Sequence, residues 1–243
     1  MSAAKNMASE KALNSATPEC PTIDYRQPDS SPYEDLFVTL QIGRKEYSIP
    51  RCYLRAYPQF QIGSVNNPYL RLLDIDEDIG HTFVHFLYTG RYETLASAPS
   101  KGTYDILKEF QRSIQVYSAA LSYEIHGLET LAKKYIEILG RSVPIYSILH
   151  TSRTVFSKIP GDKIWIRQYI YTQLQYAFSL DESIFHSDEL FQGLQNDPVF
   201  GDAVIRMIFG IYSDTISSLR PLRGPNGQMQ NMPSHSGKLE IIF

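Results

Sequence analysis

The chain has 243 residues, of which 43% are hydrophobic and 12% aromatic, and this is enough apolar material for a packed core of ordinary size. Its 23 basic and 26 acidic residues give a net charge of −3, so no basic excess exists to neutralise nucleic-acid phosphates, and its 2 cysteines cannot form a disulfide framework. The sequence has neither the apolar stretch of a signal peptide nor the roughly 20 apolar residues of a membrane span. We therefore expect an intracellular protein of the cytoplasm, the nucleus or both, which binds no membrane and no nucleic acid directly.

Both ends of the chain are predicted to be flexible. Residues 1–33 are rich in Ala, Ser, Pro and Asn, so the surface that they could bury would not offset the entropy lost on ordering them. Residues 218–243 are similarly polar and are interrupted by prolines and glycines. The last five residues, 239–243, could instead add as a strand to the edge of a sheet, and this alternative stays open.

The first folded element is predicted to be a β-hairpin over residues 35–49, because Leu36 begins an alternation of apolar and polar side chains that has the period of a half-buried strand. A short helix is expected around residues 52–54, and a third strand over residues 69–75. The acidic residues 76–78 then suit the start of a helix that ends at Gly90.

From about residue 104 onward, the apolar residues recur at helical spacing. The predicted helical stripes run over residues 107–121, 128–139, 145–156, 166–178 and 204–212. Strands followed by a long run of helices predict an α+β fold with a helical extension. One helix also carries Trp165, Tyr169, Tyr171 and Tyr176, which indicates either a helix sandwiched between neighbours or an exposed contact patch.

Two histidines are the best candidate metal ligands. His81 and His85 are four residues apart, so they share a helix face and could hold one divalent ion. A hydrolytic zinc helix would have Glu where Thr82 stands, and the sequence shows no third ligand. We therefore interpret them as surface or hydrogen-bonded histidines, and expect no metal and no cofactor.

The other candidates for chemistry have simpler interpretations. Cys52 lies at a predicted helix start, which could activate a thiol, but no neighbouring base is apparent and a buried, inert cysteine is the simpler reading. Asp74, Asp76 and Asp78 suggest a calcium loop, yet the glycine and the closing glutamate of such a loop are absent. No catalytic residue is predicted, and the protein is expected not to be an enzyme.

Five strings, taken in order, resemble a BTB/POZ domain. They are Asp35–Gly43, Tyr47–Leu54, Tyr57–Phe60, Asp76–Tyr92 with its Leu-Tyr-Thr-Gly sequence, and Val116–Ala132. The Gly-His-Thr-x-x-His form of the fourth string is similar to BTB-like proteins of filamentous fungi. The resemblance implies a BTB/POZ-like small mixed sheet flanked by helices over residues 34–140, followed by an all-helical extension over residues 141–217.

The same resemblance implies protein binding rather than catalysis. Asp35 and Arg51 would take a charged position in a dimer groove, although an ordinary ion pair near the surface is the simpler account. Leu107, Glu109 and Phe110 would supply contacts to a cullin scaffold. The sequence thus predicts a self-associating adaptor or scaffold whose helical extension recruits a protein partner. The alternatives are a substrate adaptor of a cullin-type ubiquitin ligase and, from another class, a metal- or thiol-dependent enzyme.

Overall fold

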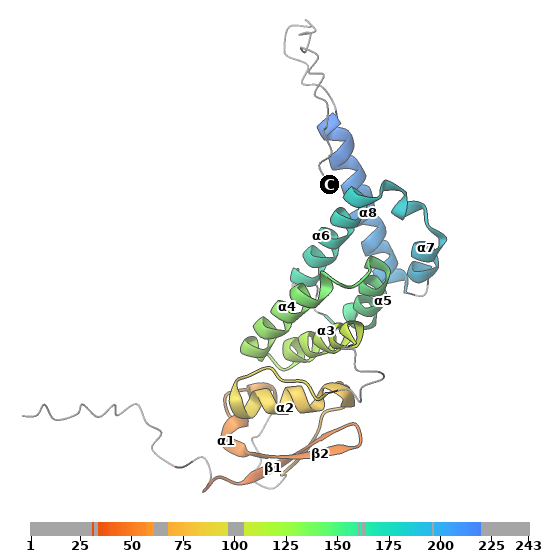
Figure 1. The fold of residues 1–243 in the computed structure, drawn as a ribbon. Coiled ribbons are helices and arrows are strands. Elements are labelled where there is room, and N and C mark those ends of the chain that lie inside the picture. The colour runs from red at the N-terminus through yellow and green to blue at the C-terminus, as the bar shows by residue number, and fades with distance from the viewer. Residues whose placement is uncertain are drawn as a thin grey trace, which may run out of the picture.

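A computed structural model describes residue 31 and residues 34–60, 68–96, 105–159, 161, 164–195 and 197–219. The predicted α+β class is confirmed, since a small mixed sheet at the N-terminal end is followed by helices (Figure 1). Most of the two predicted arms, 1–33 and 218–243, lies outside the described residues, as does the segment 239–243.

The sheet has three strands in the order β2-β1-β3. Strands β1 (Phe37–Ile42) and β2 (Lys45–Pro50) form the predicted antiparallel hairpin, while β3 (Tyr69–Arg71) pairs parallel to β1. The hairpin turn contains Gly43 in the left-handed region, at φ 58°. Strand β3 is shorter than predicted because the chain turns after residue 72, which leaves Leu73 exposed.

Short helical elements connect the strands to the first long helix. These are α1 (Arg51–Leu54), η2 (Pro58–Phe60) and η3 (Glu77–Ile79), followed by α2 (Gly80–Thr89). The carboxylate of Asp76 caps η3 by accepting a hydrogen bond of 2.9 Å from the amide of Asp78. Helix α2 ends as predicted at Gly90, which has φ 68° and donates its N–H to the carbonyl of Phe86.

The rest of the described chain is helical. Its elements are α3 (Ile106–Ser122), α4 (His126–Gly140), α5 (Ile145–Phe156), α6 (Trp165–Leu180), η4 (Glu182–His186), α7 (Asp188–Gln195) and α8 (Pro198–Leu219). The sequence pattern did not predict η4 and α7, because elements of five and eight residues are too short to establish an apolar period. Helix α2 covers the sheet, and the remaining helices extend from it in one direction (Figure 1).

Helix α6 shows how the aromatic residues are used. The ring of Trp165 lies 5.1 Å from that of Tyr117 on α3, and Tyr169 stacks on Trp165 at 5.5 Å. On another side of the helix, the hydroxyl of Tyr171 donates a hydrogen bond to α8. Three of the four aromatic residues therefore join α6 to its neighbours, and Tyr176 is the one that is largely exposed.

The end of α4 at Gly140 lies close to Tyr169 of α6, and this gives a first prediction. A Cβ at residue 140 would overlap the hydroxyl of Tyr169, which is buried and bonds to the carbonyl of Ile136 at 3.4 Å. We expect Gly140→Ala to lower the free energy of unfolding by about 1–3 kcal/mol through overpacking, despite the better helix propensity of alanine. Denaturant unfolding measures the change.

Two variants control for this effect. Gly210 is also helical, but a Cβ there meets its nearest neighbour at an ordinary 3.6 Å, so Gly210→Ala should not destabilise the protein. Adding Tyr169→Phe to Gly140→Ala removes the overlapping hydroxyl and should recover much of the loss. Purely additive effects in this double-mutant cycle would contradict the assigned clash.

Candidate functional site

Asp35, which was expected to share a charged position with Arg51, forms an ion pair with Arg55. Asp35 precedes β1, and its carboxylate pairs with Nη2 of Arg55 at 3.2 Å. Arg51 is the first residue of α1 and is half-buried. Because the guanidinium of Arg55 is largely exposed, the pair is worth only about 0–1 kcal/mol.

The three residues predicted at the start of α3 have different environments. Phe110 is fully buried, so it packs in the core and presents no surface to a partner. Glu109 accepts a hydrogen bond of 2.6 Å from Nη1 of Arg112. Leu107 remains partly exposed and borders a groove of about 260 Å³ between α3, α5 and α7. Its predicted role in partner binding remains a prediction.

The aspartates that suggested a calcium loop all have protein partners. Asp74 accepts a hydrogen bond of 2.7 Å from the hydroxyl of Tyr123, and Asp76 caps η3. Asp78 accepts two hydrogen bonds from Arg112, at 2.8 and 2.9 Å, which hold the pKa of this carboxyl below its ordinary value. Capping and ion pairing therefore account for these acidic side chains.

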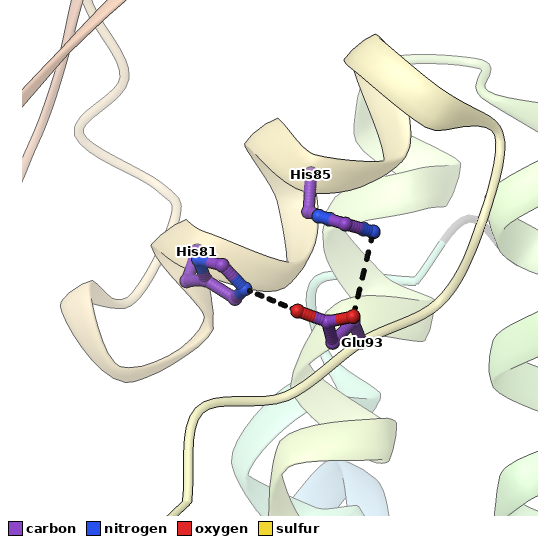
Figure 2. Close-up of side chains that lie close together, drawn as sticks. All are labelled: His81, His85 and Glu93. Carbon is purple, nitrogen blue, oxygen red and sulfur yellow. Dashed lines mark ion pairs between the residues drawn. The ribbon is translucent and has the colours of Figure 1, made fainter.

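Three potential metal ligands meet beside α2 (Figure 2). His81 and His85 lie one turn apart on the helix, with ring centroids 5.5 Å from each other. Glu93 reaches both: its Oε1 lies 3.5 Å from Nε2 of His81, and its Oε2 lies 3.8 Å from Nε2 of His85. One ligand atom from each side chain lies within 4.8 Å of the others. Two imidazoles and a carboxylate in this arrangement can hold a metal ion or form an ion-paired cluster.

The end of α2 directs Glu93 back towards the histidines. After Gly90 the chain reverses, and residues 91–96 run beside the helix that they have just left (Figure 2). The hydroxyl of Thr89 fixes this reversal, because it donates to the carbonyl of His85 at 2.8 Å and accepts from the amide of Arg91 at 3.1 Å.

Two contacts then anchor the segment on either side of Glu93. The ring of Tyr92 stacks on Tyr135 of α4, with centroids 4.2 Å apart, and burial raises the pKa of the Tyr92 phenol. The carbonyl of Leu95 accepts a hydrogen bond of 2.9 Å from Arg112 of α3. The backbone of Glu93 is therefore positioned by α3 and α4, although its side chain is exposed.

Sequence reasoning found the two histidines but missed Glu93. This third potential ligand follows His85 by eight residues in a segment without a regular period, so no spacing rule identifies it. The available signal was Gly90, since a left-handed residue at a helix end reverses the chain.

A second candidate site is the outer face of α8. Ile205, Phe209 and Ile216 are 39%, 69% and 54% exposed, and Tyr212 between them is half-buried. These four residues, called the α8 stripe below, are separated by intervals of four, three and four residues. The adjoining face of the helix packs into the core through Val204, Ile208 and Ile211, and Tyr212 at its border also contacts the rings of Phe178 and Phe185, at 5.2 and 5.7 Å.

The described structure is thus an α+β protein with a helical extension, an exposed apolar helix face and a histidine–glutamate cluster. Residues 49–143 match the family model of the HAC6 N-terminal domain, and residues 144–220 match that of the HAC6 small helical domain. The two matched segments adjoin between α4 and α5.

The chain is also similar to a subtelomeric hrmA-associated cluster protein of Aspergillus fumigatus. The identity is 44% over 190 residues, and the same values hold for the protein in each of two strains. The aligned region is 78% of this chain and 48% of the relative, so the chain spans about half the length of the curated relatives that it matches.

These comparisons correct the predicted family. The resemblance to BTB/POZ proteins is wrong, because the matching models are those of HAC6 domains and no BTB/POZ family is found. The strings that suggested it encode local structure: Leu87–Gly90, for example, is a helix end with a left-handed glycine, which helices of many families share. The expectation of cullin docking depended on this resemblance and loses its support.

Membrane insertion was not expected from the sequence. Among the described residues, no helix is long and apolar enough to cross a membrane.

Proposed function

We propose that the protein is a non-enzymatic interaction module that self-associates through the α8 stripe. The single observation that carries this proposal is the row of exposed apolar side chains on a helix that already buries another face. Intervals of four and three residues are those by which helices form a continuous apolar seam with a second helix. A row of this kind on a helix of 22 residues, about 33 Å long, favours a helical partner.

The order of residues in the stripe favours a second copy of the chain as that partner. The intervals between the four residues are the same in both chain directions. The residue types are symmetric as well, because Ile205 and Ile216 are at the two ends of the stripe and the aromatic residues Phe209 and Tyr212 are in its middle. In an antiparallel pair related by a two-fold axis, Ile205 would therefore lie opposite Ile216 of the second copy, and Phe209 opposite Tyr212. Such a contact is self-complementary without any rearrangement of the helix.

The size of the stripe indicates modest affinity. Burying an Ile or Phe side chain completely is worth about 1.5–3 kcal/mol, and the members of the stripe are only partly exposed. Association also costs at least about 4 kcal/mol in lost translational and rotational freedom. We therefore expect dissociation in the micromolar range.

Light scattering over a range of concentrations tests the proposal. The wild-type chain should convert from monomer to dimer at micromolar concentrations, and Phe209→Glu should remain monomeric because it places a charge in the apolar contact. Val199→Glu is the matched control, since Val199 is as exposed on the same helix but lies outside the stripe. A wild-type chain that stays monomeric throughout, or a dimer that survives Phe209→Glu, would contradict self-association through this face.

A further inference from the structure

We propose that His81, His85 and Glu93 form a binding site for one Zn²⁺ ion per chain, with water as the fourth ligand. This site is formed by α2 and the segment after it, so it does not depend on the α8 stripe. The inference goes beyond the proposed function because self-association through α8 requires no metal ion.

The donor atoms select the class of ion. Two imidazole nitrogens and one carboxylate suit a divalent transition metal, whereas Mg²⁺ and Ca²⁺ prefer a shell made of oxygen atoms alone. A set of two histidines and one glutamate with an open position for water is an established form of zinc coordination in proteins.

The distances are close to those between the ligand atoms of a single metal ion. With metal–ligand bonds of about 2.1 Å, neighbouring ligand atoms lie about 3.4 Å apart in a tetrahedron and about 3.0 Å apart in an octahedron. The two nitrogen–oxygen separations are 3.5 and 3.8 Å. Because the two distances end at different oxygen atoms of Glu93, its exposed side chain would rotate to offer one oxygen to an ion held by both histidines.

The state of His81 provides an independent argument. Its Nε2 atom is buried from solvent and makes no hydrogen bond to any of the residues that the structure describes, among which Glu93 is its ion-pair partner at 3.5 Å. A buried polar atom without a hydrogen bond is costly, and a metal bond would satisfy it. This nitrogen faces the carboxylate of Glu93, whose other oxygen faces Nε2 of His85 (Figure 2).

The backbone around the site is already in place. His81 and His85 belong to one rigid helix, and the contacts of Tyr92 and Leu95 hold the segment that carries Glu93. Binding would therefore require side-chain adjustment rather than folding of the segment. A bound ion would in turn connect α2 to residues 91–96, which lead towards α3.

Titration of the full chain with Zn²⁺ by calorimetry, and with Co²⁺ by visible absorption, tests the site. We expect one Zn²⁺ per chain and the intense absorption bands of four-coordinate Co²⁺. Loss of a residue that only hydrogen-bonds to a metal ligand usually reduces metal affinity by roughly 10–100-fold. His85→Ala removes a ligand itself, so it should reduce the affinity for Zn²⁺ by more than that. Glu93→Gln, at an exposed position where folding is not at risk, should weaken binding by a smaller factor.

The matched control is His126→Ala. His126 also lies beside a glutamate, Glu129, at 3.5 Å, but that pair has no second histidine, so the variant should bind Zn²⁺ as the wild type does. Absence of stoichiometric Zn²⁺ binding would overturn the proposal and leave the three side chains as an ion-paired cluster. The weak spectrum of six-coordinate Co²⁺, or an equal loss of affinity in His126→Ala, would also overturn it.

Discussion

Replacement of Phe110 by alanine is expected to lower the free energy of unfolding by about 3–5 kcal/mol, which is the usual cost of removing a buried phenylalanine. Its side chain is 0% exposed and lies against Gly140 of α4, where the two helices approach closely. Truncation would leave a cavity that the surrounding helices could fill only in part. Chemical denaturation, monitored by circular dichroism, gives the change directly.

Leu107→Ala is the matched control for this variant. Leu107 lies one turn before Phe110 on α3 but is 37% exposed, so its truncation should cost less than about 1 kcal/mol. Comparing the two variants also distinguishes a role of Phe110 in the core from a role in partner binding. A Phe110→Ala variant that keeps full stability but loses a partner would contradict the core position and favour the interaction role predicted from the sequence.

The second large effect is expected at Arg112. Its side chain is 6% exposed and makes hydrogen bonds to three different groups: the carboxylates of Asp78 and Glu109, and the carbonyl of Leu95. Arg112→Met should lower the free energy of unfolding by about 2–3 kcal/mol, below the 3–5 kcal/mol typical of a broken buried pair. The expected loss of stability is smaller than this because Asp78 is 41% exposed and stays partly solvated when its partner is lost.

The pH dependence gives a second readout for Arg112. Hydrogen bonding to Arg112 is the main cause of the lowered pKa of Asp78. A carboxyl whose pKa is lower in the folded state stabilises the protein above its ordinary pKa, and this stabilisation is lost as the pH falls through the folded-state pKa. The stability difference between wild type and Arg112→Met should therefore shrink on acidification below about pH 4.

Arg206→Met provides the control for the ion pair. Arg206 pairs with Asp202 at 2.8 Å, but both side chains are more than half exposed, so the variant should change the free energy of unfolding far less than Arg112→Met does. Equal effects at Arg112 and Arg206 would show that burial and the contact to Leu95 contribute little.

Periodicity predicted most of the fold, because it depends on neighbours in sequence. The hairpin at residues 35–49 and the long helices each contain a run of regularly spaced apolar residues. The end of α2 was predicted from Gly90 itself, because glycine is common at helix ends. The short elements η4 and α7 contain no such run. The same pattern could not show that Phe110 packs against Gly140. The apolar spacing of a helix shows which face is buried, but it does not show which other helix covers that face.

The candidate sites were harder to predict for a related reason. His81 and His85 are visible because a helix turn places them together, whereas Glu93 joins them through a chain reversal that two other helices stabilise. Arg112 likewise connects groups 34 and 17 residues away. Such contacts are set by tertiary packing. The family resemblance was incorrect, since the matching family models are those of HAC6 domains, and strings such as Leu87–Gly90 encode a common helix end.

The contact between Tyr117 and Trp165 has a consequence for how the protein unfolds. The first residue belongs to the segment that matches the HAC6 N-terminal domain and the second to the segment that matches the small helical domain. Lys133 lies over both rings, at 5.7 and 5.4 Å from their centroids. Loss of either segment would expose the aromatic surface of the other, so we expect the two segments to unfold together.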